Sequence, residues 1–145
     1  MATVFNAEAW LVDRHVAGGR GDHVAVRAAD GTTLTYAALG DHVADAAAGL
    51  HHDDRVVFVT SDGVAMFCGI LACFRAGLVA VPVSTMLSGH ELGEIVADSG
   101  ARVVVVDAPN APQLEEVLRH APDVCTVVTD GQLEIGVPPG VAVLL

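Results

Sequence analysis

The sequence contains no lysine: all seven of its basic residues are arginine, against 18 aspartate and glutamate residues and a formal net charge of −11. Nucleic-acid binding depends on basic patches that contact phosphates, so we expect no nucleic-acid partner. Anionic membrane surfaces are disfavoured for the same reason. The missing lysine also excludes a phosphate-binding loop of the Gly-Lys-Ser/Thr kind and any chemistry through a lysine Schiff base.

The sequence also lacks an apolar run long enough to cross a membrane. The longest one, 63–83, is broken by Arg75 and Pro82, and its uncharged pieces are shorter than the about 20 residues that a bilayer span requires. No basic region followed by an apolar core stands at the N-terminus, so we expect no secretory signal. The cysteines are odd in number and lie in apolar segments: Cys68, Cys73 and Cys125. They predict reduced core residues, and hence a soluble, cytoplasmic protein with no membrane partner.

Charged residues are scarce for a chain of 145 residues, at 17%, whereas hydrophobic residues make up 52% and the mean hydropathy is +0.53. A chain of this length has room for one domain, and a small domain needs many polar residues to cover its surface. The excess of apolar side chains therefore predicts that the protein packs against something outside this sequence.

Short apolar runs recur at nearly even spacing, each rich in β-branched residues: 56–59, 79–83, 103–106 and 125–128. Parallel strands that are buried on both faces have this pattern, whereas half-exposed strands alternate apolar with polar residues. Segments of helical length separate the runs. The alternation predicts an α/β fold, with parallel-sheet βα repeats over 51–130.

The helix expected after the first run has signals at both ends. Ser61 and Asp62 are candidate N-terminal caps, and Arg75 with Gly77 provides the basic last turn and the glycine that commonly end a helix. Its apolar residues form one stripe and also occupy the other faces, which predicts burial on more than one side. The stripe is Val64, Phe67, Cys68, Leu71 and Phe74.

The next two helices also have recognisable starts. Ser88 with Glu91 forms a capping box for a helix that ends at 98–100. Asn110 with Gln113 opens the following helix, which should run to about His120.

The first fifty residues predict a helix, a β-hairpin and a second helix. The first helix is capped by Asn6 and runs to about 17, and its inner side should carry Trp10, Leu11 and Val16. Segments 23–28 and 32–35 flank Asp30-Gly31, a strong two-residue hairpin turn. The second helix starts at Thr35 and should continue to 50.

The last segment, 131–145, contains the breaker Pro138-Pro139-Gly140 and then the apolar run 141–145, where the sequence stops. Most domains finish with polar, frayed residues. We therefore interpret 1–145 as a single subdomain of a longer protein, cut within a strand-like run.

Candidate chemistry is sparse. Residues 51–54, His-His-Asp-Asp, are consecutive and cannot converge on one tetrahedral metal ion without a distorted backbone, so they predict a solvated connector. His42 and Asp45 are one helical turn apart and predict a surface hydrogen bond. The remaining histidines are scattered singly and are expected to be solvated: His15, His23, His90 and His120.

Phosphate-binding and nucleophilic motifs are also missing. Residues 60–63, Thr-Ser-Asp-Gly, follow a predicted strand with one glycine and an acid, which is no dinucleotide fingerprint. No serine occupies a Gly-x-Ser-x-Gly elbow. We therefore assign no catalytic, cofactor-binding or metal-binding residue from the sequence.

Two segments carry a family resemblance. Residues 34–39, Leu-Thr-Tyr-Ala-Ala-Leu, resemble the Leu-Thr-Tyr-x-Glu-Leu segment of adenylate-forming enzymes, and 74–85 resemble their next block, a helix end running into a Val-Pro-Val strand. The opening residues 6–15 resemble the benzoate–CoA ligase branch of the AMP-forming acyl-CoA synthetases. One departure is Ala38, where the family has a glutamate that would complete a capping box with Thr35.

The resemblance implies the N-terminal subdomain of an ATP-dependent, AMP-forming acid–CoA ligase. Such an enzyme joins a carboxylic acid to ATP to give acyl-AMP and pyrophosphate, and CoA then displaces AMP. The resemblance implies ATP, Mg²⁺ and CoA for the full-length family, an aromatic acid such as benzoate as the first choice of substrate, and a fatty acid as the second. The family's Ser-Gly-Thr-Thr-Gly-x-Pro-Lys-Gly loop and its catalytic lysine are absent here, so the chain alone should bind none of these cofactors and be inactive.

The alternative is a noncatalytic α/β interaction module or truncated paralogue. In the first case the partner of the apolar surface is the remainder of the ligase, and in the second it is a separate docking protein.

Overall fold

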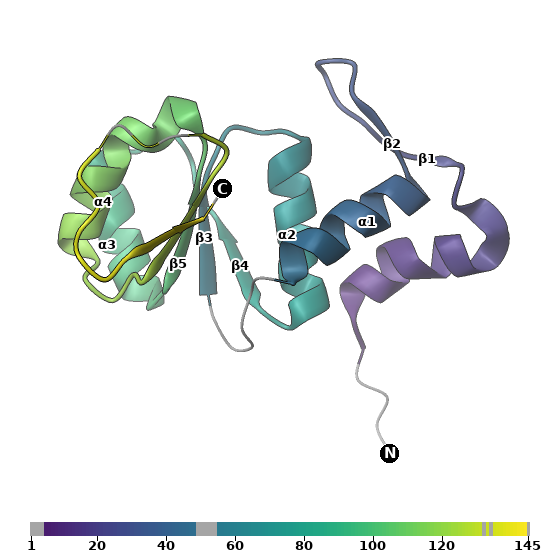
Figure 1. Ribbon diagram of the computed structural model, residues 1–145, viewed down its shortest axis with the longest axis horizontal. Coiled ribbons are helices and arrows are strands. Elements are labelled where there is room, and N and C mark those ends of the chain that lie inside the picture. Colours follow the sequence, from purple (N-terminus) through teal and green to yellow (C-terminus); the bar gives the residue numbers. More distant parts are fainter. Residues whose placement is uncertain (1–4, 49–54, 132, 134, 145) are drawn as a thin grey trace. The chain divides into compact units, whose positions relative to one another are not determined.

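The computed structural model describes residues 5–48, 55–131, 133 and 135–144, which belong to two compact units (Figure 1). The first unit comprises Met1–Asp53 and Asp62–Leu78, and the second comprises Asp54–Ser61 and Val79–Leu145. The sequence-based boundaries of a single subdomain over 1–145 stay a prediction.

The second unit contains a five-stranded sheet in the order β4-β3-β5-β6-β7, and each pair of neighbouring strands is parallel. Its strands are β3 (Arg55–Val59), β4 (Val79–Pro82), β5 (Val103–Val106), β6 (Thr126–Thr129) and β7 (Ala142–Leu144). Four of them coincide, within a residue or two, with the apolar runs that predicted buried strands. The α/β class with a parallel sheet is therefore confirmed, and β7 confirms a strand in the last apolar run, of which residue 145 lies outside the described residues.

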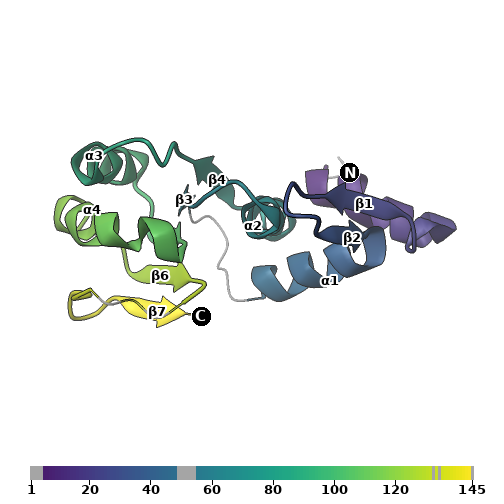
Figure 2. The same ribbon diagram turned by 90° about the horizontal axis from the view of Figure 1, so that it is seen from above.

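Helices α3 (Gly89–Ser99) and α4 (Leu114–His120) cover one face of this sheet and lie side by side (Figure 2). Valines at alternating strand positions pack against both helices. The core of the unit is Val57, Val59, Leu92, Val96, Ala101, Val104, Val106, Leu114, Val117, Leu118, Ala121, Val124 and Val127.

The predicted start of α3 is confirmed: the Ser88 hydroxyl accepts from the Glu91 backbone N–H, and the Glu91 carboxylate accepts from the Ser88 N–H at 2.9 Å. Its end at Gly100 is also confirmed, with φ of 63°. The predicted cap by Asn110 and Gln113 is wrong. The chain enters a 3₁₀ helix, η3 (Ala108–Gln113), before α4, because prolines occupy two of its six positions and Asn110 is buried within it.

The first unit contains the π-helical segments η1 (Ala9–Asp13) and η2 (Val16–Arg20), the antiparallel strands β1 (Val24–Arg27) and β2 (Thr33–Thr35), and the helices α1 (Tyr36–Ala47) and α2 (Val64–Ala76). Its core is Val12, Leu39, Val43, Cys68, Leu71 and Ala72. The predicted order of helix, hairpin and helix is confirmed. The predicted cap of α1 is confirmed as well, since Thr35 Oγ1 accepts from the Ala38 N–H at 3.2 Å.

The predicted inner side of the first helix is wrong. Trp10, Leu11 and Val16 are 54%, 49% and 41% exposed, and the buried side chains are Glu8 and Val12. The backbone is π-helical over η1 and η2, and the buried pair Glu8 and Val12 is four residues apart, a spacing that the predicted set of 10, 11 and 16 does not have.

The hairpin turn is one residue longer than predicted. The N–H of Ala28 donates to Thr32 O at 2.9 Å, so residues 29–31 form a three-residue loop. Gly31 has φ of 90°, and the N–H of Thr32 donates to the Asp30 carboxylate at 2.8 Å. A three-residue loop with glycine in the left-handed position is the next most common hairpin after the two-residue turn.

Helix α2 ends as predicted at Gly77, with φ of 75°, but begins differently. Its N-cap is Gly63, without a side-chain cap, so the prediction of Ser61 and Asp62 as caps is wrong. The apolar stripe is only partly buried, because Phe67 and Phe74 are 43% and 38% exposed. No helix in the described part of the chain is long and apolar enough to cross a membrane.

Candidate functional site

Polar residues directly follow three neighbouring strands of the parallel sheet. Thr60 and Ser61 follow β3, Asp107 follows β5, and Asp130 follows β6. Ligands of open α/β sheets bind outside the carboxyl ends of the strands. This edge of the sheet, defined by these four residues and called the carboxyl edge below, is therefore the candidate functional site.

Asp107 joins two of these strand ends. Its Oδ2 accepts from the backbone N–H of Ser61 at 2.8 Å, and its Oδ1 accepts from the side-chain amide of the buried Asn110. Both carboxylate oxygens are thus engaged by donors of the protein itself.

Asp130 makes the matching contact between the next two strand ends. Its Oδ1 accepts from the backbone N–H of Ala108 at 2.9 Å. Beside it, the buried Thr129 accepts from the Gly131 N–H through its hydroxyl at 3.4 Å. Side-chain to backbone hydrogen bonds therefore connect the ends of β3, β5 and β6 and fix the loops that follow them.

The electrostatics of Asp107 follow from these contacts. Burial raises the pKa of its carboxyl group, but the hydrogen bonds from Ser61 and Asn110 favour the ionised form and together outweigh burial. The net result is a pKa below the ordinary value of an aspartate, so the carboxyl edge carries a negative charge at neutral pH.

These residues do not fit the triphosphate of ATP. The carboxylates of Asp107 and Asp130 would repel phosphate oxygens, and the chain has no lysine to offset them. They are also poorly suited to hold Mg²⁺, because both oxygens of Asp107 already accept hydrogen bonds. The Thr60 hydroxyl is buried without a partner among the described residues, but one hydroxyl makes no phosphate cradle. We therefore interpret these four residues as stabilising the loops after the strands, and we assign them no ligand.

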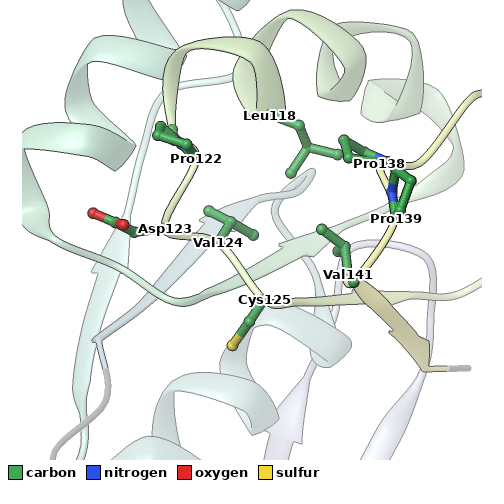
Figure 3. A pocket seen from close by; sticks show the side chains of 10 residues that line it. Leu118, Pro122, Asp123, Val124, Cys125, Pro138, Pro139 and Val141 are labelled. Carbon is green, nitrogen blue, oxygen red and sulfur yellow. The ribbon is translucent and has the colours of Figure 1, made fainter.

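A pocket of about 430 Å³ lies at the opposite edge of the sheet, next to the amino ends of β6 and β7 (Figure 3). Most of its side chains are apolar, with Leu118, Val124, Pro138 and Val141 around the opening and Asp123 at one side. The remaining lining residues are Ala121, Pro122, Cys125, Pro139 and Gly140. Because it is remote from the strand ends where ligands of such sheets bind, we assign no chemistry to it.

Neither feature is predicted above from the sequence, although each has a signal there. An acid within two residues of the end of a predicted buried strand marks Asp107 and Asp130, since the carboxyl ends of parallel strands meet at one edge. Prolines 138 and 139 were interpreted only as a breaker, and their contact with 118–125 depends on the tertiary fold.

The residues considered for chemistry from the sequence lie as follows. The segment 51–54 falls outside the described residues. His42 and Asp45 are exposed on α1, and the His15 ring stacks on Tyr36 with centroids 4.3 Å apart. The prediction of singly scattered histidines is wrong for His90 and His120, whose ring nitrogens are 3.1 Å apart. Cys68 and Cys73 are buried and free as predicted, whereas Cys125 is half-buried.

Residues 13–138 match the family described as "AMP-binding enzyme". The chain belongs to this family. The resemblance found in 34–39 and 74–85 is therefore confirmed at the level of the adenylate-forming acid–CoA ligases, and the parallel sheet is the fold of this family's N-terminal region.

The relatives that are 30% identical or more include two acid–CoA ligases with different substrates in their names. The long-chain-fatty-acid–CoA ligase FadD13 of Mycobacterium tuberculosis is 36% identical over 102 residues, which is 67% of this chain and 20% of that protein. The 4-hydroxybenzoate–CoA/benzoate–CoA ligase of Rhodopseudomonas palustris is 31% identical over 132 residues, which is 88% of this chain and 24% of that protein. The chain thus spans about a fifth to a quarter of the length of these curated relatives.

A solved structure with the same fold is that of the anthranilate CoA ligase AuaEII in complex with anthranoyl-AMP. The TM-score is 0.79 at 21% identity, over 89% of this chain and 25% of that chain. At this identity the likeness concerns the fold.

Proposed function

We propose that this chain forms part of the scaffold of an ATP-dependent acid–CoA ligase. The observation that carries the proposal is the family match over residues 13–138 together with the parallel sheet of the second unit. In the proposed reaction, a carboxylate oxygen attacks the α-phosphorus of ATP, pyrophosphate leaves, and the CoA thiol then displaces AMP from the acyl group. ATP, Mg²⁺ and CoA belong to the proposal for the whole protein.

The 145 residues alone are proposed to be inactive. The charge that develops on the phosphates during adenylation needs cationic groups and a loop of backbone N–H donors. The chain has no lysine, and the carboxyl edge presents the carboxylates of Asp107 and Asp130 instead. The role proposed for this chain is therefore structural: it provides the parallel sheet as part of the enzyme's scaffold.

An aromatic acid such as benzoate is the proposed substrate, and a fatty acid is second. The likeness to the 4-hydroxybenzoate–CoA/benzoate–CoA ligase extends over more of this chain, 88% of it, and supports the first choice. The likeness to FadD13 is shorter but higher in identity and supports the second.

A second candidate function is a noncatalytic interaction module. It is favoured by large apolar side chains that are exposed on the described part of the chain. Met86 is 94% exposed, and Val143 and Leu144 on the edge strand β7 are each 44% exposed. Surfaces of this kind commonly mark protein contacts.

A pyrophosphate-release assay tests the proposals. The 145-residue chain and the longest natural polypeptide that contains it are each incubated with ATP, Mg²⁺, CoA and either benzoate or decanoate. We expect release only from the longer polypeptide, and a kcat/KM for benzoate at least about tenfold higher, the difference that 1.4 kcal/mol of transition-state binding gives. Turnover by the 145-residue chain overturns its predicted inactivity, and a preference for decanoate overturns the substrate choice. If the natural reading frame ends at 145 and the chain is inactive, the interaction module is the better account.

A further inference from the structure

Two histidines and a glutamate meet where α3 and α4 pack together. His90 lies in the first turn of α3, and Glu116 and His120 lie one helical turn apart on α4. The Nδ1 atom of His90 is 3.1 Å from the Nε2 atom of His120, and one ligand atom from each of the three side chains lies within 4.8 Å of the others. The three come from positions up to 30 apart in the sequence, so the helix packing creates the cluster.

Two glycines on α3 bring the ligand-bearing face of α4 close. A Cβ atom built on Gly93 would lie 2.7 Å from the Cβ of His120, and one built on Gly89 would lie 3.0 Å from the Cβ of Glu116. Real Cβ atoms essentially never come closer than 3.0 Å to another heavy atom, so a larger residue at position 93 would push His120 away. The backbone of α3 therefore sets the positions of both α4 ligands relative to His90.

We propose that His90, Glu116 and His120 form a surface binding site for a zinc ion. Zinc in proteins takes imidazole nitrogens at about 2.0–2.1 Å and carboxylate oxygens at about 2.0–2.2 Å, usually in a tetrahedron. The edge of such a tetrahedron is about 3.3–3.4 Å, from the same bond lengths. The 3.1 Å between the two ring nitrogens is close to that edge, and three protein ligands leave the fourth position to water.

The surroundings of His90 suit a metal ligand. Its other ring nitrogen, Nε2, lies 3.5 Å from Oε1 of Glu94, one turn along α3. Metal-bound histidines almost always donate their second ring N–H to such an acceptor, which fixes the tautomer that leaves the first nitrogen free to bind. Glu94 would therefore orient the ring of His90.

A cation next to the cluster, Arg119, competes weakly for Glu116. Arg119 Nη1 lies 4.0 Å from Glu116 Oε1, and the two side chains are 63% and 43% exposed. An exposed pair at this distance contributes little, so Glu116 is available to the ion. Without metal, the two rings form a hydrogen bond in which one nitrogen donates and the other accepts.

Isothermal titration calorimetry of the metal-free 145-residue chain with ZnCl₂ at pH 7.5 tests the site. We expect one ion per chain, with affinity reduced about tenfold or more in His90→Ala, Glu116→Gln and His120→Ala. The exposed His23→Ala, and the double variant His51→Ala/His52→Ala, serve as matched controls and should bind as tightly as the parent. Cobalt(II) provides a second readout, because its visible absorption should be that of a tetrahedral site and should be lost in the same three variants.

The outcomes are decisive even if one variant fails to fold. His120 packs against Gly93, whereas His90 is exposed, so His90→Asn tests the ligand at a position that the fold tolerates. Zinc binding that survives His90→Asn and Glu116→Gln, or that is lost only in the double variant at 51 and 52, overturns the proposal. The titration contains no ATP or acid, so its result is independent of the proposed ligase function.

Discussion

Arg75, in the last turn of α2, donates from Nη1 to the carboxylate of Glu8 at 3.1 Å, across 67 positions of sequence. Glu8 is 1% exposed, and the same guanidinium nitrogen lies 3.2 Å from Asp13 Oδ1. Burial raises the pKa of Glu8, the charge of Asp13 raises it further, and Arg75 opposes both. Arg75 thus compensates the charge of a buried carboxyl group, and it connects α2 to the N-terminal helical segment.

Replacing Arg75 should destabilise the first unit. We expect Arg75→Met to lower the free energy of unfolding by about 2 kcal/mol at pH 7, less than for a fully buried pair because Arg75 is partly exposed. The loss should shrink as the pH falls through the raised pKa of Glu8, where the carboxyl group becomes neutral. Urea unfolding of both proteins at pH 7 and pH 5 measures the difference.

Arg119→Met is the matched control for this substitution. Arg119 is 63% exposed and its nearest carboxylate oxygen is 4.0 Å away, so its loss should leave the urea midpoint unchanged. Equal losses for the two arginine variants would show that the burial of Glu8 does not matter.

Gly93 should not tolerate a methyl group. In Gly93→Ala the new Cβ would lie 2.7 Å from the Cβ of His120, so α3 and α4 must separate. We expect a loss of about 2 kcal/mol, typical of overpacking. Thermal unfolding followed by circular dichroism measures the change.

Gly40, in the interior of α1, is the comparison for Gly93. A Cβ there would lie 3.7 Å from Val12 Cγ1, an ordinary contact. Gly40→Ala should therefore stabilise the protein by about 0.5–1 kcal/mol, because alanine is the better helix former. Stabilisation by both substitutions would contradict the close approach of α4 at position 93.

The strands of the parallel sheet could be predicted because their signal is local. The run 103–106 consists of four valines and coincides with β5, and the capping box at Ser88 and Glu91 is present as predicted. A strand that is buried on both faces consists almost entirely of apolar residues, so the strand can be recognised from its own few residues.

The exposed face of the N-terminal segment could not be predicted in this way. Its apolar residues do not single out one face, and the tertiary contacts bury Val12 while leaving the neighbouring Leu11 49% exposed. The contact between His90 and His120 depends on how two helices pack, and the sequence holds only an indirect hint in Gly89 and Gly93. Features that depend on tertiary packing therefore cannot be predicted from a short stretch of sequence.

Asp107 should make the second unit sensitive to acid. Its pKa in the folded state is below that of the unfolded chain, where an aspartate titrates at about pH 4. The ionised carboxylate therefore contributes stability that is present above this value and is lost as the pH falls through the folded pKa. In Asp107→Asn the charge is gone, although an amide oxygen can still accept from the Ser61 N–H.

We expect Asp107→Asn to be about 1 kcal/mol less stable than the parent at pH 7, the difference between charged and neutral hydrogen bonds. The two proteins should converge in stability as the pH is lowered below 4, since the parent then loses its charge as well. Urea unfolding at pH 7, 5 and 3 measures this, with the exposed Asp123→Asn as a control that should follow the parent throughout. A constant difference between parent and Asp107→Asn at all three values would mean that shape, rather than the ionised carboxylate, holds the ends of β3 and β5 together.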